Sequence, residues 1–156
     1  MQQSLASGCA ASALFIGLGL ACIQGVAADD SSAGIVTLDD RQWATSTNGP
    51  DIKWPDADTY CADLSLDGKD DWRLPTLAEL ETLHDPGRES GIREPISLEG
   101  CCLWSSTSLE DRAAEDGDEI GGEPHMYRWG YMFDGGLYYY AVHIFEDGQA
   151  LCTRDD

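Results

Sequence analysis

Residues 70–84 read DDWRLPTLAELETLH and predict a short helix with a capped start. The hydroxyl of Thr76 can accept the backbone N–H of Glu79, and the Glu79 carboxylate can accept the N–H of Thr76, which together form a capping box. One apolar stripe runs along this helix at every third position: Leu77, Leu80 and Leu83. Many capped surface helices share this spacing, so it predicts the element rather than the fold.

Three further motifs accompany the helix: WPDADTYC at 54–61, LWSST at 103–107 and CTR at 152–154. With these four ordered motifs, residues 40–154 resemble the Lcl C-terminal domain family, a group of extracytoplasmic bacterial modules named after a collagen-like adhesin. The resemblance implies a C-type-lectin-like α+β fold, distantly related to formylglycine-generating enzymes, in which two short helices flank a twisted antiparallel sheet. It also implies a disulfide between Cys61 and Cys152.

The N-terminal residues predict export from the cytoplasm. Residues 1–28 contain no charged side chain and carry an apolar run over residues 10–23, which is too short for a membrane span. Small residues before Asp29 are typical of a signal-peptide cleavage site, while Cys22 offers lipidation as an alternative. We therefore expect a signal peptide over 1–28, a flexible lead over 29–39 and a domain over 40–156, either secreted, periplasmic or at the cell surface.

The charge balance excludes several classes of partner. The chain has 29 acidic and 9 basic residues, a formal net charge of −20. Such an excess disfavours binding to nucleic acids and to anionic lipid surfaces. Solubility or a saline habitat accounts for it, and cation binding is the alternative.

Four cysteines follow the predicted signal peptide, and an even number in an exported chain predicts disulfides. Cys101 and Cys102 are adjacent, so their Cα atoms lie about 3.8 Å apart, below the usual disulfide range of about 4.4–6.8 Å. A bond between them is expected to be strained and easily reduced. Two free thiols or an intermolecular bond are equally compatible with the sequence.

Period-two and helical patterns predict the remaining elements. Ile35–Leu38 is a short strand candidate in the lead, and 103–107 is another strand. A first helix is expected to bury one face, composed of Ala57, Tyr60, Cys61 and Leu64. The last third predicts a three-stranded meander, with strands at 126–133, 137–145 and 149–154.

Aromatic side chains of this meander are the candidate ligand-binding residues. Tyrosine and tryptophan combine an apolar body with one polar end, and they favour recognition surfaces. We expect an aromatic and acidic face, which includes the 110–123 segment, to recognise an extracellular glycan or protein. Its candidate contact residues are Trp129, Tyr131, Tyr138, Tyr140 and His143. Core packing is the alternative for at least half of the tyrosines.

The sequence contains no catalytic or phosphate-binding motif, so we expect no enzyme activity and no cofactor. Clustered carboxylates in a loop suit Ca²⁺, and the candidate ligands are Asp116, Asp118, Glu119 and Glu123. A solvated acidic loop is the alternative, and a calcium-stabilised structural domain is the competing function. The resemblance also suggests another alternative function, a copper–thiol enzyme that uses Cys101 and Cys102. The adjacency of these cysteines does not match the spacing of that enzyme class.

Overall fold

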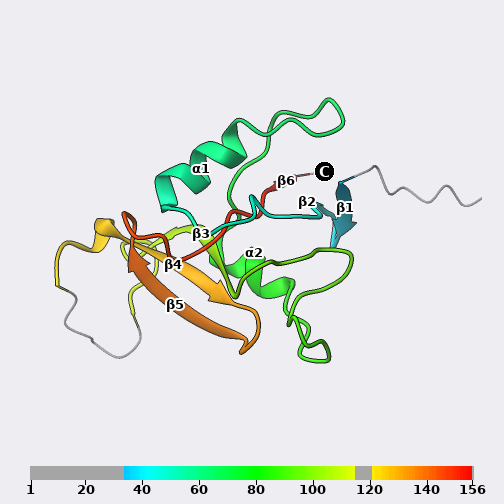
Figure 1. The fold of residues 1–156 in the computed structure, drawn as a ribbon. Coiled ribbons are helices and arrows are strands. Elements are labelled where there is room, and N and C mark those ends of the chain that lie inside the picture. Colours follow the sequence, from blue (N-terminus) through cyan, green and yellow to red (C-terminus); the bar gives the residue numbers. More distant parts are fainter. Residues whose placement is uncertain (1–33, 115–120, 156) are drawn as a thin grey trace, which may run out of the picture.

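The computed structural model describes residues 34–114 and 121–155, which form an α+β fold. Two helices and two small antiparallel sheets make up this part of the chain (Figure 1). The predicted signal peptide and residues 29–33 of the lead lie outside the described residues. A single sheet flanked by the helices was expected, and the division into two sheets corrects that prediction.

The first sheet joins the start of the domain to its end. It contains β1 (Ile35–Leu38), β2 (Arg41–Ala44) and β6 (Thr153–Asp155) in the order β1-β2-β6. Trp43 of β2 lies opposite Val36 on one side and Thr153 on the other. The strand prediction for Ile35–Leu38 is therefore confirmed, and this strand falls within the stretch predicted as a flexible lead over 29–39.

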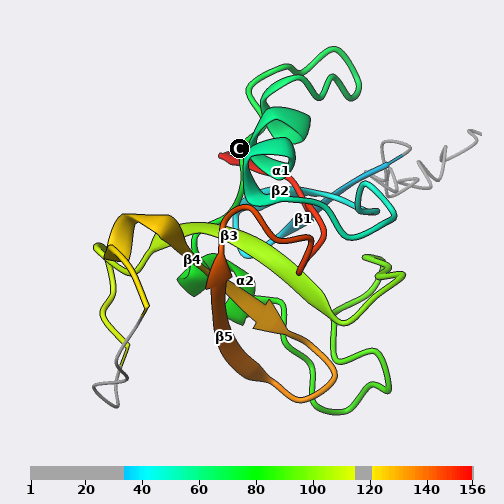
Figure 2. The same cartoon turned by 60° about the vertical axis from the view of Figure 1, so that its left-hand side comes forward.

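The second sheet contains β3 (Cys102–Ser108), β4 (Tyr127–Met132) and β5 (Leu137–Val142) in the order β3-β4-β5. The meander prediction is wrong for the last strand, because β6 pairs with β2 of the first sheet. The strand that pairs with β4 on its other side is β3 (Figure 2). The strand expected over 137–145 ends at Val142, because the chain turns there and the N–H of Phe145 donates to the Val142 carbonyl at 3.0 Å.

Helix α2 (Leu77–Thr82) begins with the predicted capping box. The N–H of Glu79 donates to the Thr76 hydroxyl at 3.3 Å, and the N–H of Thr76 donates to the Glu79 carboxylate at 2.8 Å. All three leucines of the predicted stripe are buried. In Figures 1 and 2 this helix lies against the β3-β4-β5 sheet, so the stripe packs into the shared core.

Helix α1 (Trp54–Ala62) buries Ala57 and Cys61. Tyr60, which the spacing placed on the buried face, is 36 % exposed instead. A short 3₁₀ turn, η1 (Pro124–Met126), precedes β4.

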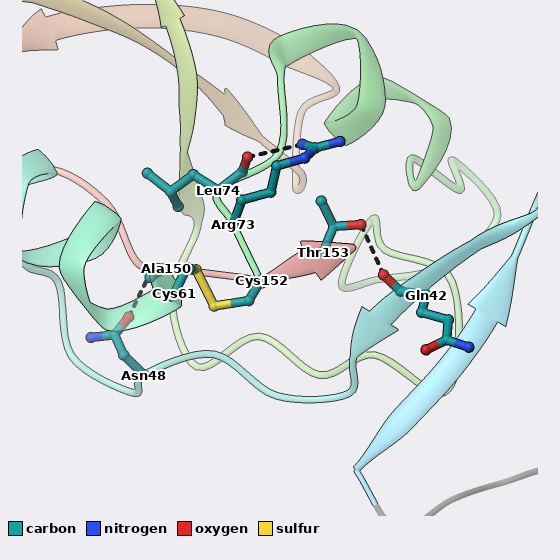
Figure 3. The surroundings of a disulfide bond; sticks show 8 residues. All are labelled: Gln42, Asn48, Cys61, Arg73, Leu74, Ala150, Cys152 and Thr153. Carbon is teal, nitrogen blue, oxygen red and sulfur yellow. Dashed lines mark hydrogen bonds between the residues drawn. A yellow bond between two sulfur atoms is a disulfide. The ribbon is translucent and has the colours of Figure 1, made fainter. Parts of the chain in front are cut away.

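The predicted disulfide between Cys61 and Cys152 is confirmed, and it joins α1 to the segment just before β6. Both residues are fully buried, with their Cα atoms 5.3 Å apart across 91 positions of sequence. Figure 3 shows hydrogen bonds on both sides of it: the N–H of Ala150 donates to the Asn48 side chain, and the Thr153 hydroxyl donates to the Gln42 carbonyl at 2.8 Å. The bond therefore lies within a hydrogen-bonded part of the core.

Candidate functional site

Pairing of β4 with β5 gathers the predicted aromatic residues on one face of the sheet. Tyr140 lies opposite Trp129, with ring centroids 5.3 Å apart, and Tyr138 lies opposite Tyr131 at 5.5 Å. Both pairs meet edge to face, which is a favoured geometry for aromatic rings. We call this group the aromatic cluster, and its rings belong to Tyr127, Trp129, Tyr131, Phe133, Tyr138 and Tyr140.

Exposure divides the aromatic cluster into a floor and a rim. Trp129 and Tyr131 are only 5 % and 3 % exposed, whereas Tyr138 is 37 % exposed and Tyr140 is half-buried. The buried pair can position the rim but presents little surface of its own to a ligand. Of the predicted contact residues in the cluster, Tyr138 presents the most surface, and its role as a ligand contact stays a prediction.

Arg112 covers part of this cluster and was missed by the sequence analysis. Its guanidinium carbon lies 4.6 Å from the Tyr138 ring centroid and 5.4 Å from that of Trp129. The indole N–H of Trp129 donates to the Arg112 carbonyl at 2.8 Å. A cation over an aromatic face is attracted to it, so Arg112 adds a charged hydrogen-bond donor beside the exposed ring. Its position as an arginine among carboxylates in residues 110–115 was the available signal.

Glu81 of α2 adds a carboxylate next to the Tyr138 hydroxyl. A hydrogen bond to Glu81 and, next, burial raise the pKa of the Tyr138 hydroxyl, and Arg112 acts in the opposite direction. The phenol therefore keeps its proton at neutral pH. Tyr138 thus presents an apolar ring and a polar end close to one positive and one negative side chain. We call Tyr138, Arg112 and Glu81 the rim site.

His143 lies apart from the rings of the aromatic cluster. It falls in the turn after β5, where its carbonyl accepts the backbone N–H of Trp54 at 3.1 Å. Tyr139 packs on the opposite side of β5, with its ring centroid 6.1 Å from that of Trp104 and its hydroxyl donating to the Asp147 carbonyl at 2.8 Å. Burial raises the pKa of this phenol. Alternation along β5 therefore places Tyr139, which is half-buried, on the opposite face from Tyr138 and Tyr140.

The predicted calcium ligands fall largely outside the described residues. Asp116, Asp118 and Glu119 belong to residues 115–120, and only Glu123 is described, as an exposed residue that precedes η1. Across 34–114 and 121–155, no group of three or more histidine, cysteine or acidic side chains is placed to hold a metal ion. The calcium prediction remains untested for the loop itself.

The two serines of the LWSST motif have structural partners. Ser105 is buried and its hydroxyl donates to the Trp129 carbonyl at 2.7 Å, while the Ser106 hydroxyl donates to the Pro75 carbonyl at 3.3 Å. Thr107 accepts the backbone N–H of Leu77, the first residue of α2, at 3.0 Å. This motif therefore attaches α2 to the second sheet and bonds to the backbone of Trp129 in the aromatic cluster.

A second polar group lies between α2 and the first sheet. The Arg73 guanidinium donates two hydrogen bonds of 2.9 Å to the Glu79 carboxylate, and Arg41 approaches the same carboxylate at 3.1 Å. Burial raises the pKa of Glu79, but Arg73 and the Thr76 N–H outweigh it and lower the pKa to about 2. A hollow of about 250 Å³ borders this group, but its charged side chains are already paired. We interpret it as structural.

Cys101 and Cys102 form a disulfide in the structure, one of the states that the sequence left open. Their Cα atoms lie 3.7 Å apart, and the bond stands at the start of β3. Within the described residues, no helix is long and apolar enough to cross a membrane.

The profile of the Lcl C-terminal domain family matches residues 36–152, well over half of the chain. The chain belongs to the Lcl C-terminal domain family. This Lcl domain also resembles the crystal structure of EMS16, described as an antagonist of the collagen receptor integrin α2β1, at 14 % identity and a TM-score of 0.46. That alignment covers 80 % of this chain and 98 % of EMS16. A search of curated proteins found no match.

Proposed function

We propose that this Lcl domain is a non-enzymatic binding module that recognises an extracellular glycan or protein through the rim site and the acidic segment at 110–123. We further propose that it adopts a C-type-lectin-like fold and acts outside the cytoplasm. Two disulfides in a single small domain support an oxidising compartment. The family and the α+β architecture are compatible with a binding role but do not name the ligand.

The observation that carries the proposal is the exposed ring of Tyr138, which contacts the Arg112 guanidinium and has the Glu81 carboxylate near its hydroxyl. An aromatic face offers apolar surface to a sugar ring or a side chain, and a phenol, a guanidinium and a carboxylate together supply both donors and acceptors. The buried floor of Trp129 and Tyr131 fixes the position of Tyr138, so little conformational entropy is lost when a ligand binds.

A glycan array and a pull-down from cell-surface extracts, both made with the mature chain, test this proposal. We expect at least one reproducible ligand, and its binding should weaken when the rim site is altered. If neither screen returns a ligand, the binding role is contradicted. Calorimetric titration with Ca²⁺ separates the proposal from the calcium-stabilised structural domain, because only the latter predicts heat release together with a raised melting temperature.

A further inference from the structure

The two disulfides of the described residues lie in different surroundings. Cys61 and Cys152 are fully buried, and their Cα separation of 5.3 Å falls in the usual range of about 4.4–6.8 Å. Cys101 is exposed, Cys102 is 7 % exposed, and their Cα separation of 3.7 Å falls below that range. Thiol–disulfide exchange requires that a thiolate reach one of the sulfurs. Only the second bond can be reached without opening the core.

Backbone hydrogen bonds hold the adjacent cysteines in place independently of the sulfur–sulfur bond. The N–H of Phe133 donates to the Cys101 carbonyl at 3.1 Å, and the N–H of Gln149 donates to the Cys102 carbonyl at 2.9 Å. Trp104 returns a hydrogen bond to the Gln149 carbonyl at 3.0 Å. Because these contacts do not involve sulfur, opening the bond leaves two thiols beside each other, and reclosure is an intramolecular step.

Two acidic residues lie near the backbone that leads into Cys101. Glu99 is an exposed residue two positions before it, and the Asp51 carboxylate lies 3.6 Å from the position that a Cβ atom would take on Gly100. The whole chain carries a net charge of −20. A negative surface attracts cations and repels anions, and salt screens both effects. Anionic thiols are therefore expected to reach Cys101 more slowly than neutral or cationic ones.

We infer that Cys101–Cys102 is a reversible thiol–disulfide exchange site for neutral or cationic thiols, while Cys61–Cys152 stays closed. A thiolate of an incoming dithiol attacks the Cys101 Sγ atom and forms a mixed disulfide there. The bond to Cys102 breaks, and the Cys102 Sγ atom keeps the electron pair and takes a proton from water. The second thiolate of the dithiol then attacks the dithiol's own first sulfur in the mixed disulfide. The dithiol is released as a cyclic disulfide. Cys101 departs as a thiolate and is protonated, so the protein gains two electrons and two protons and the dithiol loses them.

Peptide mapping after mild reduction tests this inference. The mature protein is treated with increasing amounts of dithiothreitol, a neutral dithiol, then quenched with acid, alkylated and analysed by mass spectrometry. We expect alkylation of Cys101 and Cys102 at concentrations that leave Cys61 and Cys152 unlabelled and the circular dichroism spectrum unchanged. The inference is overturned if both disulfides open together, if Cys61–Cys152 opens first, or if Cys101–Cys102 opens only as the protein unfolds.

A second experiment tests the charge selectivity. Mixed-disulfide formation at Cys101 is timed with cysteamine, a cation, and with 2-mercaptoethanesulfonate, an anion, and each rate is divided by the rate of the same thiol with a small neutral disulfide. At low salt we expect the normalised rate of cysteamine to be about tenfold that of 2-mercaptoethanesulfonate. The ratio of the two normalised rates should approach one in about 1 M salt. Glu99→Gln should accelerate the anionic thiol. Equal normalised rates at low salt would contradict the selectivity.

Discussion

The two sheets have the same number of strands and the same antiparallel pairing, yet they differ in what they carry. The β1-β2-β6 sheet joins residues from the two ends of the domain, lies next to the buried disulfide and bears the ion pairs around Glu79. The β3-β4-β5 sheet carries the aromatic cluster, whose outer members reach solvent. The comparison indicates that the first sheet stabilises the fold by joining the two ends of the domain. The second sheet presents the surface on which recognition is proposed.

The largest expected effect comes from removing the disulfide beside the first sheet. Replacing both Cys61 and Cys152 by serine frees a loop of about ninety residues in the unfolded chain, because the two positions are 91 apart. The chain-entropy model then predicts a loss of roughly 4–5 kcal/mol of unfolding free energy and a fall of many degrees in melting temperature. Thermal denaturation followed by circular dichroism measures it.

The matched control is the double serine variant at Cys101 and Cys102. Their bond closes no long loop, so the melting temperature should change far less than in the first variant. Similar losses in the two variants would remove the distinction between the buried and the exposed disulfide.

A smaller effect concerns Glu79, which caps α2 and pairs with Arg73. Its pKa of about 2 lies below the ordinary value of 4.5, so the folded state binds the proton more weakly than the unfolded state. The stability that Glu79 contributes is therefore complete above about pH 4.5 and is lost as the pH falls towards 2. We expect the difference in unfolding free energy between wild type and Glu79→Gln to shrink over that interval in urea titrations. Glu89→Gln, which removes an exposed carboxylate from the following loop, is the control.

The smallest effect on stability is expected at the rim site. A double-mutant cycle with Arg112→Ala and Tyr138→Ala measures how strongly the guanidinium and the ring are coupled. At a partly exposed site this coupling should be about 0.5–1 kcal/mol in unfolding free energy, because water competes for the cation. A coupling near zero would show that the two side chains are not held together in solution.

Local signals predicted the helices well, and non-local pairing was the part that sequence reasoning missed. The capping box at Thr76 and Glu79 lies within four residues, so the start of α2 could be read directly. The position of β6 could not be read in this way, because short turns favour pairing between consecutive strands. Nothing in the sequence near Thr153 indicates that its partner is Trp43, more than a hundred residues earlier. The Cys61–Cys152 bond was predicted only through the resemblance to the family.

The candidate site was predicted only in part, again because non-local contacts could not be read from the sequence. Alternation along β4 and β5 correctly placed several aromatic rings on one face, but it could not tell Trp129 and Tyr131, which are buried, from Tyr138, which is exposed. That distinction depends on the elements that cover the sheet. Arg112 reaches the cluster from a different segment, so only the tertiary structure reveals its contact with Tyr138.

The division of roles between the two sheets is tested most directly by comparing Tyr138→Ala with Tyr60→Ala for binding to a ligand returned by the screens. Tyr60 on α1 has nearly the same exposure, 36 % against 37 %, and lies outside the aromatic cluster, so it is a matched control. We predict that Tyr138→Ala weakens binding at least about tenfold, within the range of an aromatic hot spot, while Tyr60→Ala binds as wild type does. Equal affinities for the two variants would contradict the assignment of recognition to the β3-β4-β5 sheet.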